Sequence, residues 1–380
     1  VTGVQTCALP ISRYQSDTTS LTYLPHQVGI DTDWEPTSLV SGPSHCAAIK
    51  SDGSLWAWGS NYFGQLGDGT NDDKDTPVQV GTDTDWDTVA AGYGYTIAVR
   101  TDGSLWGWGC NYHGQLGDGT NEDKNSPVQI GTDTDWNVIS AGYYHCTAIK
   151  TDGSLWAWGS NTYGQLGVGT NEDKNTPSRI GADKDWHNVS AGYAHTIAIR
   201  TGGTLWAWGN NYSGQLGDGT NEDKNSPVQI GTDTDWGDIS AGYYHCAAIK
   251  TDDSLWAWGN NYLGQFVFLD FPNEFENTPV QIGMDSDWES VSSGSCHFIA
   301  IKINGSLWAW GSNYSGQLGD GTNAYRDTPV PAGMETDWAE AVAGNGCTAA
   351  IKTDGTLWFW GREPIPTGVI IIGDPVLHVD

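Results

Sequence analysis

Residues 137–167 read NVISAGYYHCTAIKTDGSLWAWGSNTYGQLG. The runs NVISAG, HCTAIK and SLWAWG are rich in β-branched and small apolar residues, and a fourth run, TPSRIG at 176–181, has Pro near its start. The pair Asp152-Gly153 separates two of these runs and is a strong hairpin signal. SLWAWG is apolar at alternate positions on both faces, as in a strand that is covered on both sides. The unit therefore predicts four short strands and no helix.

The tryptophans show how often this unit recurs. All 21 Trp fall at two sites, a pair in SLWAWG or its variants and a single residue that closes DTDW or its variants. The pairs are Trp56/Trp58, Trp106/Trp108, Trp156/Trp158, Trp206/Trp208, Trp256/Trp258, Trp308/Trp310 and Trp358/Trp360. The singles are Trp34, Trp86, Trp136, Trp186, Trp236, Trp288 and Trp338. Successive pairs begin 50 or 52 residues apart, a period typical of a solenoid or a propeller. We expect the paired Trp to form a structural core between blades.

The two ends of the repeat region complement each other. Residues 24–29, LPHQVG, match the PVQVG strand that ends later units, whereas the last unit stops at Gly361 without such a strand or a GQLG loop. A linear solenoid leaves exposed ends that need caps, whereas a ring removes its edge strands. We therefore predict an all-β protein, a closed seven-bladed β-propeller of about 50-residue repeats with four strands per blade, closed by the N-terminal half-unit.

The motifs SAGYYHCTAIK, TDGSLWAWG and SNTYGQLG, within residues 140–167, resemble the regulator of chromosome condensation repeat family. The resemblance covers about residues 24–361 and implies a seven-bladed propeller, but it is weak for function because one fold hosts many activities. In repeat type and length the chain is also similar to bacterial-type propellers, the propeller-type β-lactamase inhibitor proteins, which implies that the family can bind a protein partner.

Three segments lie outside the repeat pattern. Residues 1–12 fit no repeat, and VTGVQTCALPI resembles a translated sequencing adapter, the alternative being a flexible terminus. We expect 13–361 to form one propeller domain, and 362–380 is an atypical tail that we do not place. At 266–276 the fifth complete unit replaces the usual loop with a Phe-rich sequence that contains Phe266 and Phe268. This segment is either a hydrophobic insertion that docks a partner or a reading-frame error.

The charge balance excludes some classes of partner. The chain has 46 Asp+Glu and 16 Lys+Arg, a formal net charge of −30. Such a surface repels phosphate backbones, so we expect no nucleic-acid partner. No apolar stretch approaches 18 residues, so we expect no membrane span. The near-identical repeats and the Lys-poor acidic balance favour a prokaryotic, metagenomic origin and slightly favour a secreted or cell-surface location, with the true N-terminus missing. We expect a monomer.

Metal chemistry is not indicated by the repeated polar residues. Five units carry His at one position (His45, His145, His195, His245 and His297), with Tyr95 and Cys347 in two others. Zinc needs donors near 2 Å from one point, whereas equivalent positions on packed sheets lie about 10 Å apart. We therefore expect a structural His bonded within its own blade. The acidic stretches 67–75 and 81–87 do not complete a calcium-loop pattern, which favours solvated turns.

Catalysis is not indicated either. The chain has no G-x-S-x-G elbow, no H-E-x-x-H pair and no complete P-loop. Its carboxylate pairs recur in every unit, whereas active sites usually break a repeat. The Cys of one repeat position lie two blades apart, too far for disulfides. We expect no catalytic residue, no cofactor and no metal.

Tyrosine dominates the two loops most suited to recognition. The loop after SAG contains Tyr93, Tyr95, Tyr143, Tyr144, Tyr193, Tyr243 and Tyr244, and the SNYxG loop adds Tyr62, Tyr112, Tyr163, Tyr212, Tyr262 and Tyr314. Tyr supplies large, rigid contact area at binding surfaces, although these rings could also pack between blades. The sequence therefore predicts a non-catalytic binding propeller that recognises an unknown protein partner through a Tyr-rich loop face. The alternatives are a guanine-nucleotide exchange regulator of a small GTPase, or a propeller module of a larger truncated enzyme or surface protein.

Overall fold

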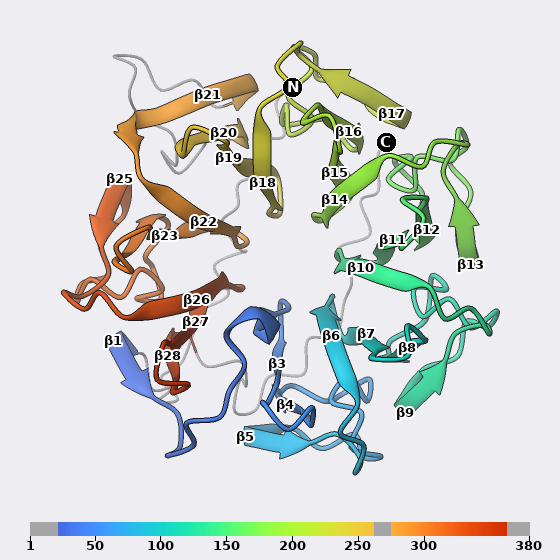
Figure 1. The fold of residues 1–380 in the computed structure, drawn as a ribbon, viewed down its shortest axis with the longest axis horizontal. Coiled ribbons are helices and arrows are strands. Elements are labelled where there is room, and N and C mark those ends of the chain that lie inside the picture. Colours follow the sequence, from blue (N-terminus) through green and yellow to red (C-terminus); the bar gives the residue numbers. More distant parts are fainter. Residues whose placement is uncertain (1–21, 262–274, 363–380) are drawn as a thin grey trace, which may run out of the picture.

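The computed structural model describes residues 22–261 and 275–362, and these ranges form seven four-stranded antiparallel sheets arranged in a ring (Figure 1). Within these ranges the only helix is the 3-10 turn η1 (Pro36–Ser38). The first blade contains β2 (Val40–Ser41), β3 (His45–Ile49), β4 (Leu55–Gly59) and β5 (Lys74–Gln79). The second contains β6 (Trp86–Ala91), β7 (Tyr95–Arg100), β8 (Leu105–Gly109) and β9 (Lys124–Gln129). The third contains β10 (Trp136–Ala141), β11 (His145–Lys150), β12 (Leu155–Gly159) and β13 (Lys174–Arg179).

The remaining blades repeat this order from the centre of the ring outward. The fourth contains β14 (Trp186–Ala191), β15 (His195–Arg200), β16 (Leu205–Gly209) and β17 (Lys224–Ile230). The fifth contains β18 (Trp236–Ala241), β19 (His245–Lys250), β20 (Ser254–Asn260) and β21 (Phe275–Ser286). The sixth contains β22 (Trp288–Ser293), β23 (His297–Lys302), β24 (Leu307–Gly311) and β25 (Arg326–Pro331). The seventh contains β26 (Trp338–Ala343), β27 (Cys347–Lys352), β28 (Leu357–Gly361) and β1 (Thr22–Gln27).

The seventh blade joins the two ends of the chain. β1 pairs with β28 through His26↔Phe359 and Gln27↔Trp358, and the Val28 amide donates to the Leu357 carbonyl at 2.8 Å. Figure 1 shows β1, in blue, beside β28, in red. The predicted all-β, closed seven-bladed propeller is therefore confirmed, including closure by the N-terminal half-unit.

The Asp-Gly turn between the second and third strands of a blade requires glycine. Gly153 adopts φ +76°, and a Cβ there would lie 2.1 Å from the Lys184 carbonyl oxygen. The fifth blade has Asp253 at this position, with φ 61°, and there β21 continues to Ser286, which pairs with Ser254. In the other blades the segment before the single Trp packs over this glycine. In the fifth blade, where the turn has Asp253 instead, that segment is part of β21.

The core consists of layers between neighbouring blades. In one of them, Ile149 and Leu155 of the third blade pack with Trp186 and Trp208 of the fourth. The second Trp of each pair lies in such a layer with at most 3% of its surface exposed, and these residues are Trp58, Trp108, Trp158, Trp208, Trp258, Trp310 and Trp360. They therefore hold the blades together from inside and are excluded as binding-site residues, because they have no surface to offer a partner.

The two Trp of a pair are not equally buried. The first Trp packs against the edge of the layer and stays half-buried, and these residues are Trp56, Trp106, Trp156, Trp206, Trp256, Trp308 and Trp358. The two Trp are two positions apart and so lie on the same face of the strand, but the first is nearer the turn, where the Trp56 indole bonds the Ser54 hydroxyl at 2.9 Å.

The buried Trp also link the blades through hydrogen bonds. The indole of Trp208 donates from Nε1 to the Gln165 carbonyl of the preceding blade at 2.9 Å. The same bond to the preceding GQLG loop is made by Trp108, Trp158, Trp258 and Trp360. These bonds join each of those GQLG loops to the next blade.

A cation lies between the other two Trp of each blade. Lys250 Nζ is 4.7 Å from the ring centroids of both Trp236 and Trp256, and it bonds Asp233 at 2.6 Å and Asp235 at 3.0 Å. Burial lowers the pKa of Lys250, but these carboxylates outweigh burial and raise it overall. Equivalent cations between two Trp rings are Lys50, Arg100, Lys150, Arg200, Lys302 and Lys352. The Asp residues of the DTD turns, which we expected to be solvated, therefore form ion pairs with these Lys and Arg side chains.

Candidate functional site

Both Tyr-bearing loops lie at the same end of the ring. β11 and β12 are antiparallel and His145 pairs with Gly159, so the loop before β11 and the loop after β12 meet. The Ser160 amide donates to the Tyr144 carbonyl at 2.8 Å, and the second and fourth blades contain the same bond. We call this end the aromatic face. The TDG turns and DTDW segments lie at the opposite end of the strands.

Four tyrosines form a continuous arc around the inner edge of the aromatic face. Tyr93 and Tyr143 stack with ring centroids 4.2 Å apart, Tyr143 and Tyr193 are 4.6 Å apart, and Tyr193 and Tyr243 are 4.8 Å apart. Tyr143 also contacts Tyr243 at 5.5 Å, although the fourth blade lies between their blades. All four side chains are half-buried. The second to fifth blades thus contribute one tyrosine each to what we call the tyrosine arc.

Two further tyrosines pack against the arc. Tyr144 is 4.5 Å from Tyr143, and Tyr244 is 5.8 Å from Tyr243. Tyr95 differs, because it is fully buried and its hydroxyl lies 2.7 Å from the His145 carbonyl of the next blade. We therefore correct the expectation for Tyr95, which has no exposed surface to offer a partner.

The SNYxG loops place a second set of tyrosines in solvent on the same face. Tyr62, Tyr112, Tyr212 and Tyr314 share one repeat position and are 64–78% exposed. In the third unit the tyrosine is shifted by one residue, to Tyr163, which is half-buried. Tyr262, Phe266 and Phe268 lie outside the described residues. The structure thus brings the two loop sets together on one face.

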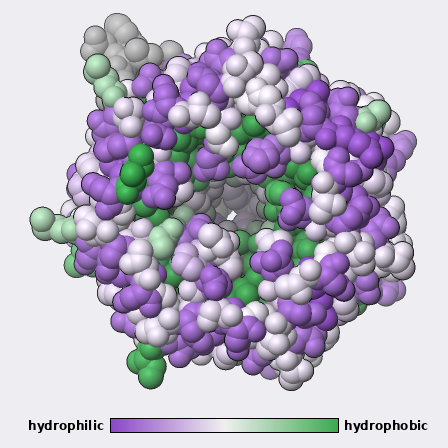
Figure 2. All heavy atoms as spheres, in the orientation of Figure 1, coloured by the Kyte–Doolittle hydropathy of each residue, from purple (hydrophilic) through white to green (hydrophobic). Residues whose placement is uncertain are grey.

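The inner edge of the aromatic face is not symmetric. The sixth, seventh and first blades have Ser295, Asn345 and Pro43 at the position of the arc tyrosines. A pocket at the channel mouth is lined by both kinds of residue, Tyr143, Tyr193 and Tyr243 on one side and these three on the other. The mouth at this end therefore has an aromatic half and a polar half. Figure 2 shows the central opening from the opposite end of the ring, with hydrophilic residues over most of the surrounding surface.

Backbone hydrogen bonds between blades hold these loops. The Tyr143 amide donates to the Gly192 carbonyl and the Tyr193 amide to the Gly242 carbonyl, both at 3.2 Å. The first blade has Pro43 there, which has no amide hydrogen to donate. Because these hydrogen bonds fix the backbone of each loop to the next blade, the tyrosine side chains are held in defined positions.

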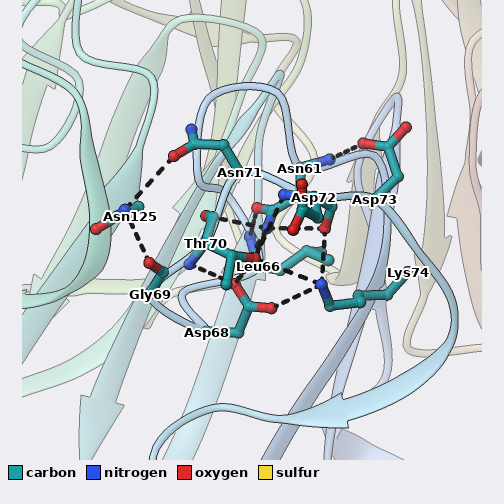
Figure 3. A network of polar contacts seen from close by, with 10 residues as sticks. All are labelled: Asn61, Leu66, Asp68, Gly69, Thr70, Asn71, Asp72, Asp73, Lys74 and Asn125. Atoms are coloured by element: carbon teal, nitrogen blue, oxygen red, sulfur yellow. Dashed lines mark hydrogen bonds and ion pairs between the residues drawn. The ribbon is translucent and has the colours of Figure 1, made fainter.

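The outer loops of the aromatic face carry an excess of acid within well-bonded networks (Figure 3). Asn61 Nδ2 donates to Asp68 Oδ1 and to the Thr70 and Asp72 carbonyls, while its Oδ1 accepts from the Leu66 amide. Asn125 of the next blade donates to the Gly69 carbonyl at 3.1 Å and links the two blades. Each such loop in the described residues has one Lys or Arg but two to four carboxylates. The face is therefore aromatic inside and acidic outside.

Sequence reasoning missed two acids on the inner strands. Asp238 on β18 and Glu340 on β26 interact electrostatically. Burial, and then the Asp238 carboxylate, raise the pKa of Glu340 to about 8. Burial also raises the pKa of Asp238, against hydrogen bonds from the Ile239 and Val291 amides. Both residues come two positions after the single Trp of their unit. This position relative to the Trp is the sequence signal that would have placed them on the inner strands.

The repeated histidines connect neighbouring blades. His145 Nε2 lies 3.0 Å from Thr196 Oγ1, and that hydroxyl donates to the Gln165 carbonyl at 3.0 Å. Because the hydroxyl gives its proton to the carbonyl, the imidazole is the donor in the first bond. Burial lowers the pKa of His145 to about 3. The expectation of a bond within the same blade was wrong, because the partner belongs to the next blade.

No metal or redox site is found in the described ranges. Within 22–261 and 275–362 there is no group of three or more His, Cys, Asp or Glu that could hold an ion, and the Cys residues there are free. Burial raises the pKa of the Cys146 thiol, which keeps it protonated. No helix in the same ranges is long and apolar enough to span a membrane.

Comparisons with known proteins agree with this architecture. The RCC1-like domain matches residues 7–266, and regulator of chromosome condensation repeats match 288–317 and 304–351. The ultraviolet-B receptor UVR8 of Arabidopsis thaliana is 40% identical over 57 residues, which span 15% of this chain and 13% of that protein. The Danio rerio protein RCC2 homolog is 38% identical over 58 residues, 15% of this chain and 12% of that protein.

Solved structures show the same fold at low sequence identity. Human WBSCR16 superposes with a TM-score of 0.76 at 19% identity, over 90% of this chain and 89% of that one. Yeast RCC1 (Prp20), in a structure with Kap60, has a TM-score of 0.71 at 19% identity, over 86% of this chain and 80% of that one. Since the RCC1-like domain match covers more than half of its length, this chain belongs to the RCC1-like domain family.

Proposed function

We propose that this chain is a non-catalytic binding propeller that recognises a protein partner, as a monomer, through the aromatic face. The observation that supports this most is the tyrosine arc, which covers one half of the channel mouth while Ser295, Asn345 and Pro43 line the other. Tyr combines a large apolar area with a polar tip and few rotatable bonds, which suits it to protein recognition.

The outer tyrosines extend the same surface. Tyr112 and Tyr212 are 64% and 71% exposed, and an exposed aromatic ring loses its water contacts when a partner covers it. RCC1-like propellers are generally binding or regulatory domains. We extend the proposal to the resemblance inferred from repeat type and length, namely that the chain is a bacterial-type propeller similar to the propeller-type β-lactamase inhibitor proteins.

A capture experiment tests the proposal. Tagged chain would be used to isolate partners, and a Tyr112→Ser/Tyr212→Ser/Tyr243→Ser variant should lose most of the captured protein. The control is Met334→Ser, which removes an apolar side chain that is 97% exposed on the opposite face. Equal capture by the tyrosine variant would contradict the assignment of the face.

Guanine-nucleotide exchange on a small GTPase is the second candidate. One structure of this fold concerns yeast Prp20p and its binding properties to Gsp1p and histones, with a TM-score of 0.71 over 86% of this chain. Its 19% identity supports the shared fold alone. Accelerated nucleotide release from a GTPase in the presence of this chain would favour exchange over simple binding.

A further inference from the structure

A second pocket lies on the aromatic face between the first and second blades. Its lining includes Phe63 and Asn71 of the first blade and Asp123, Lys124 and Asn125 of the second. Its volume is about 380 Å³, within the range of sites that accept a side chain or a small ligand. An aromatic ring on one blade therefore faces a carboxylate on the next across an open seam.

At the next seam a side chain of the protein itself occupies the space beside the equivalent carboxylate. Between the second and third blades, His113 occupies the position of Phe63 and Asp173 that of Asp123. His113 Nδ1 lies 3.2 Å from Asp173 Oδ2, and the imidazole packs 4.9 Å from the Tyr144 ring. A planar nitrogen donor of the chain thus bonds the carboxylate at this seam, whereas Phe63 has no polar atom to reach Asp123.

The electrostatics of the first seam favour a cation. Asp123 Oδ1 accepts a bond from the Asn111 amide at 2.8 Å. Burial nevertheless raises the pKa of Asp123, despite the opposing effects of that amide and of Lys124. Lys124 Nζ lies 3.4 Å from Glu122 and 3.8 Å from Asp118, so other carboxylates share its charge. Asp123 is therefore an exposed carboxylate at the edge of the pocket, and Lys124 balances its charge only in part.

Aromatic rings complete the pocket. Phe63 makes edge-on contacts with Tyr62 at 4.9 Å and Tyr112 at 6.0 Å, so three rings cluster beside the seam. A guanidinium is planar, carries several donors in a fixed fork and stacks on aromatic faces. It would combine the two interactions that His113 makes in the next seam.

We propose that this pocket accepts an arginine side chain of the protein partner, with the guanidinium paired to Asp123 and packed against Phe63. This inference rests on the proposed function, and it specifies an arginine as the residue of the partner that binds here. Because the outer loops carry more acid than base, a basic segment is also drawn to this face.

The test uses the peptide acetyl-Gly-Gly-Arg-Gly-Gly-amide, with its citrulline analogue as the neutral isostere. In full-length chain labelled with 3-fluorotyrosine, the ¹⁹F signals of Tyr62 and Tyr112 should shift with the arginine peptide and not with the citrulline peptide. Asp123→Asn and Phe63→His should each weaken the response at least tenfold. Asp173→Asn, which neutralises the equivalent carboxylate beside His113, should leave it unchanged. Circular dichroism and thermal unfolding of each variant verify folding.

Several outcomes would overturn the inference: an equal response to citrulline, a response that survives Asp123→Asn, or an equal loss in Asp173→Asn. Partner capture separates this inference from the proposed function. If the tyrosine variant loses the partner and Phe63→His retains it, the arginine pocket is wrong and the binding face stands. If both variants retain the partner, the proposed function is wrong as well.

Discussion

At the scale of single residues, the seams between blades depend on buried neutral side chains. Burial lowers the pKa of His195 to about 3, with smaller contributions from His145 and His245. The unfolded chain binds a proton near pH 6.5, whereas the folded chain resists it until about pH 3. The stabilisation is therefore fully present above pH 6.5 and is lost as the pH falls toward 3.

The second blade supplies the substitution that tests this. Tyr95 replaces the histidine there and faces Cys146, and His195 likewise faces a cysteine, Cys246, at 3.1 Å. We expect His195→Tyr to fold and to reduce the acid dependence of the unfolding free energy by about 1.4 kcal/mol per pH unit between pH 6 and 4. Urea unfolding at these pH values measures the slope. His187→Tyr, at an exposed position, is the control, and equal slopes in the two variants would contradict the assignment.

Glu340 has the opposite pH dependence. Its pKa is raised to about 8, so the folded chain holds a proton that the unfolded chain releases near pH 4.5. Stability therefore falls as the pH rises from 4.5 to 8. We expect Glu340→Gln to be more stable than the parent by about 2 kcal/mol at pH 9, less than the full shift implies because the side chain is only half-buried. Thermal unfolding at pH 5 and 9 measures this, and the exposed Glu289→Gln should show no such gain.

At the scale of elements, the loop after the third strand is stabilised by one repeated network. Asn111 Nδ2 donates to Asp118 Oδ1, and Thr120 bonds the same carboxylate through its amide and its hydroxyl. The third unit has Val168 at the position of Asp118, and there the Asn161 Nδ2 donates only to the Thr170 and Glu172 carbonyls. The network is thus incomplete in one blade.

Val168→Asp should complete that network. The equivalent Asp118 side chain is only 10% exposed, and two or three new hydrogen bonds to such a carboxylate should raise the unfolding free energy by about 1 kcal/mol, measured by urea unfolding. The reverse change, Asp118→Val, should lower it by about as much or more, because Asn111 and Thr120 would lose their partner. If Val168→Asp lowers stability, the loop of the third blade does not share the geometry of its neighbours.

The elements themselves were predictable from sequence, whereas contacts between units were not. Trp pairs recur every 50 or 52 residues, each preceded by Asp-Gly or a variant of it, so one unit defined the strands of all seven blades. The Lys or Arg before this turn was also visible in the sequence, but its position between two Trp rings depends on Trp236, 14 positions before Lys250, as well as on Trp256. The ring contact of Tyr143 with Tyr243 and the electrostatic effect of Asp238 on Glu340 each skip a blade, and both arise because the ring brings non-adjacent inner strands together.

At the scale of the whole molecule, stability depends on a ring that closes through a single strand. β1 pairs with β28, and the Tyr23 carbonyl accepts from the Gly321 amide of the sixth blade at 2.9 Å. One six-residue strand therefore completes the seventh blade and also bonds the preceding one. The seam between the fifth and sixth blades is held differently, because Phe298 stands where the other units have Thr or Cys and stacks on Trp310 with centroids 5.1 Å apart. His245 Nε2 and Trp310 Nε1 are buried there without a hydrogen-bond partner among the described residues.

Removal of the closing strand tests the ring as a unit. Deletion of residues 1–27 would expose the edge of β28, and the loss of its ladder and of the bond from Gly321 should lower the unfolding temperature by roughly 10 °C, the equivalent of about 5 kcal/mol. Deletion of residues 1–12, which fit no repeat, is the matched control and should leave the unfolding temperature unchanged. Calorimetry measures both, and light scattering would show whether the exposed edge pairs with another chain. Equal unfolding temperatures for the two deletions would mean that β1 contributes little to closure, and the ring would then have to be held by the contacts between its blades alone.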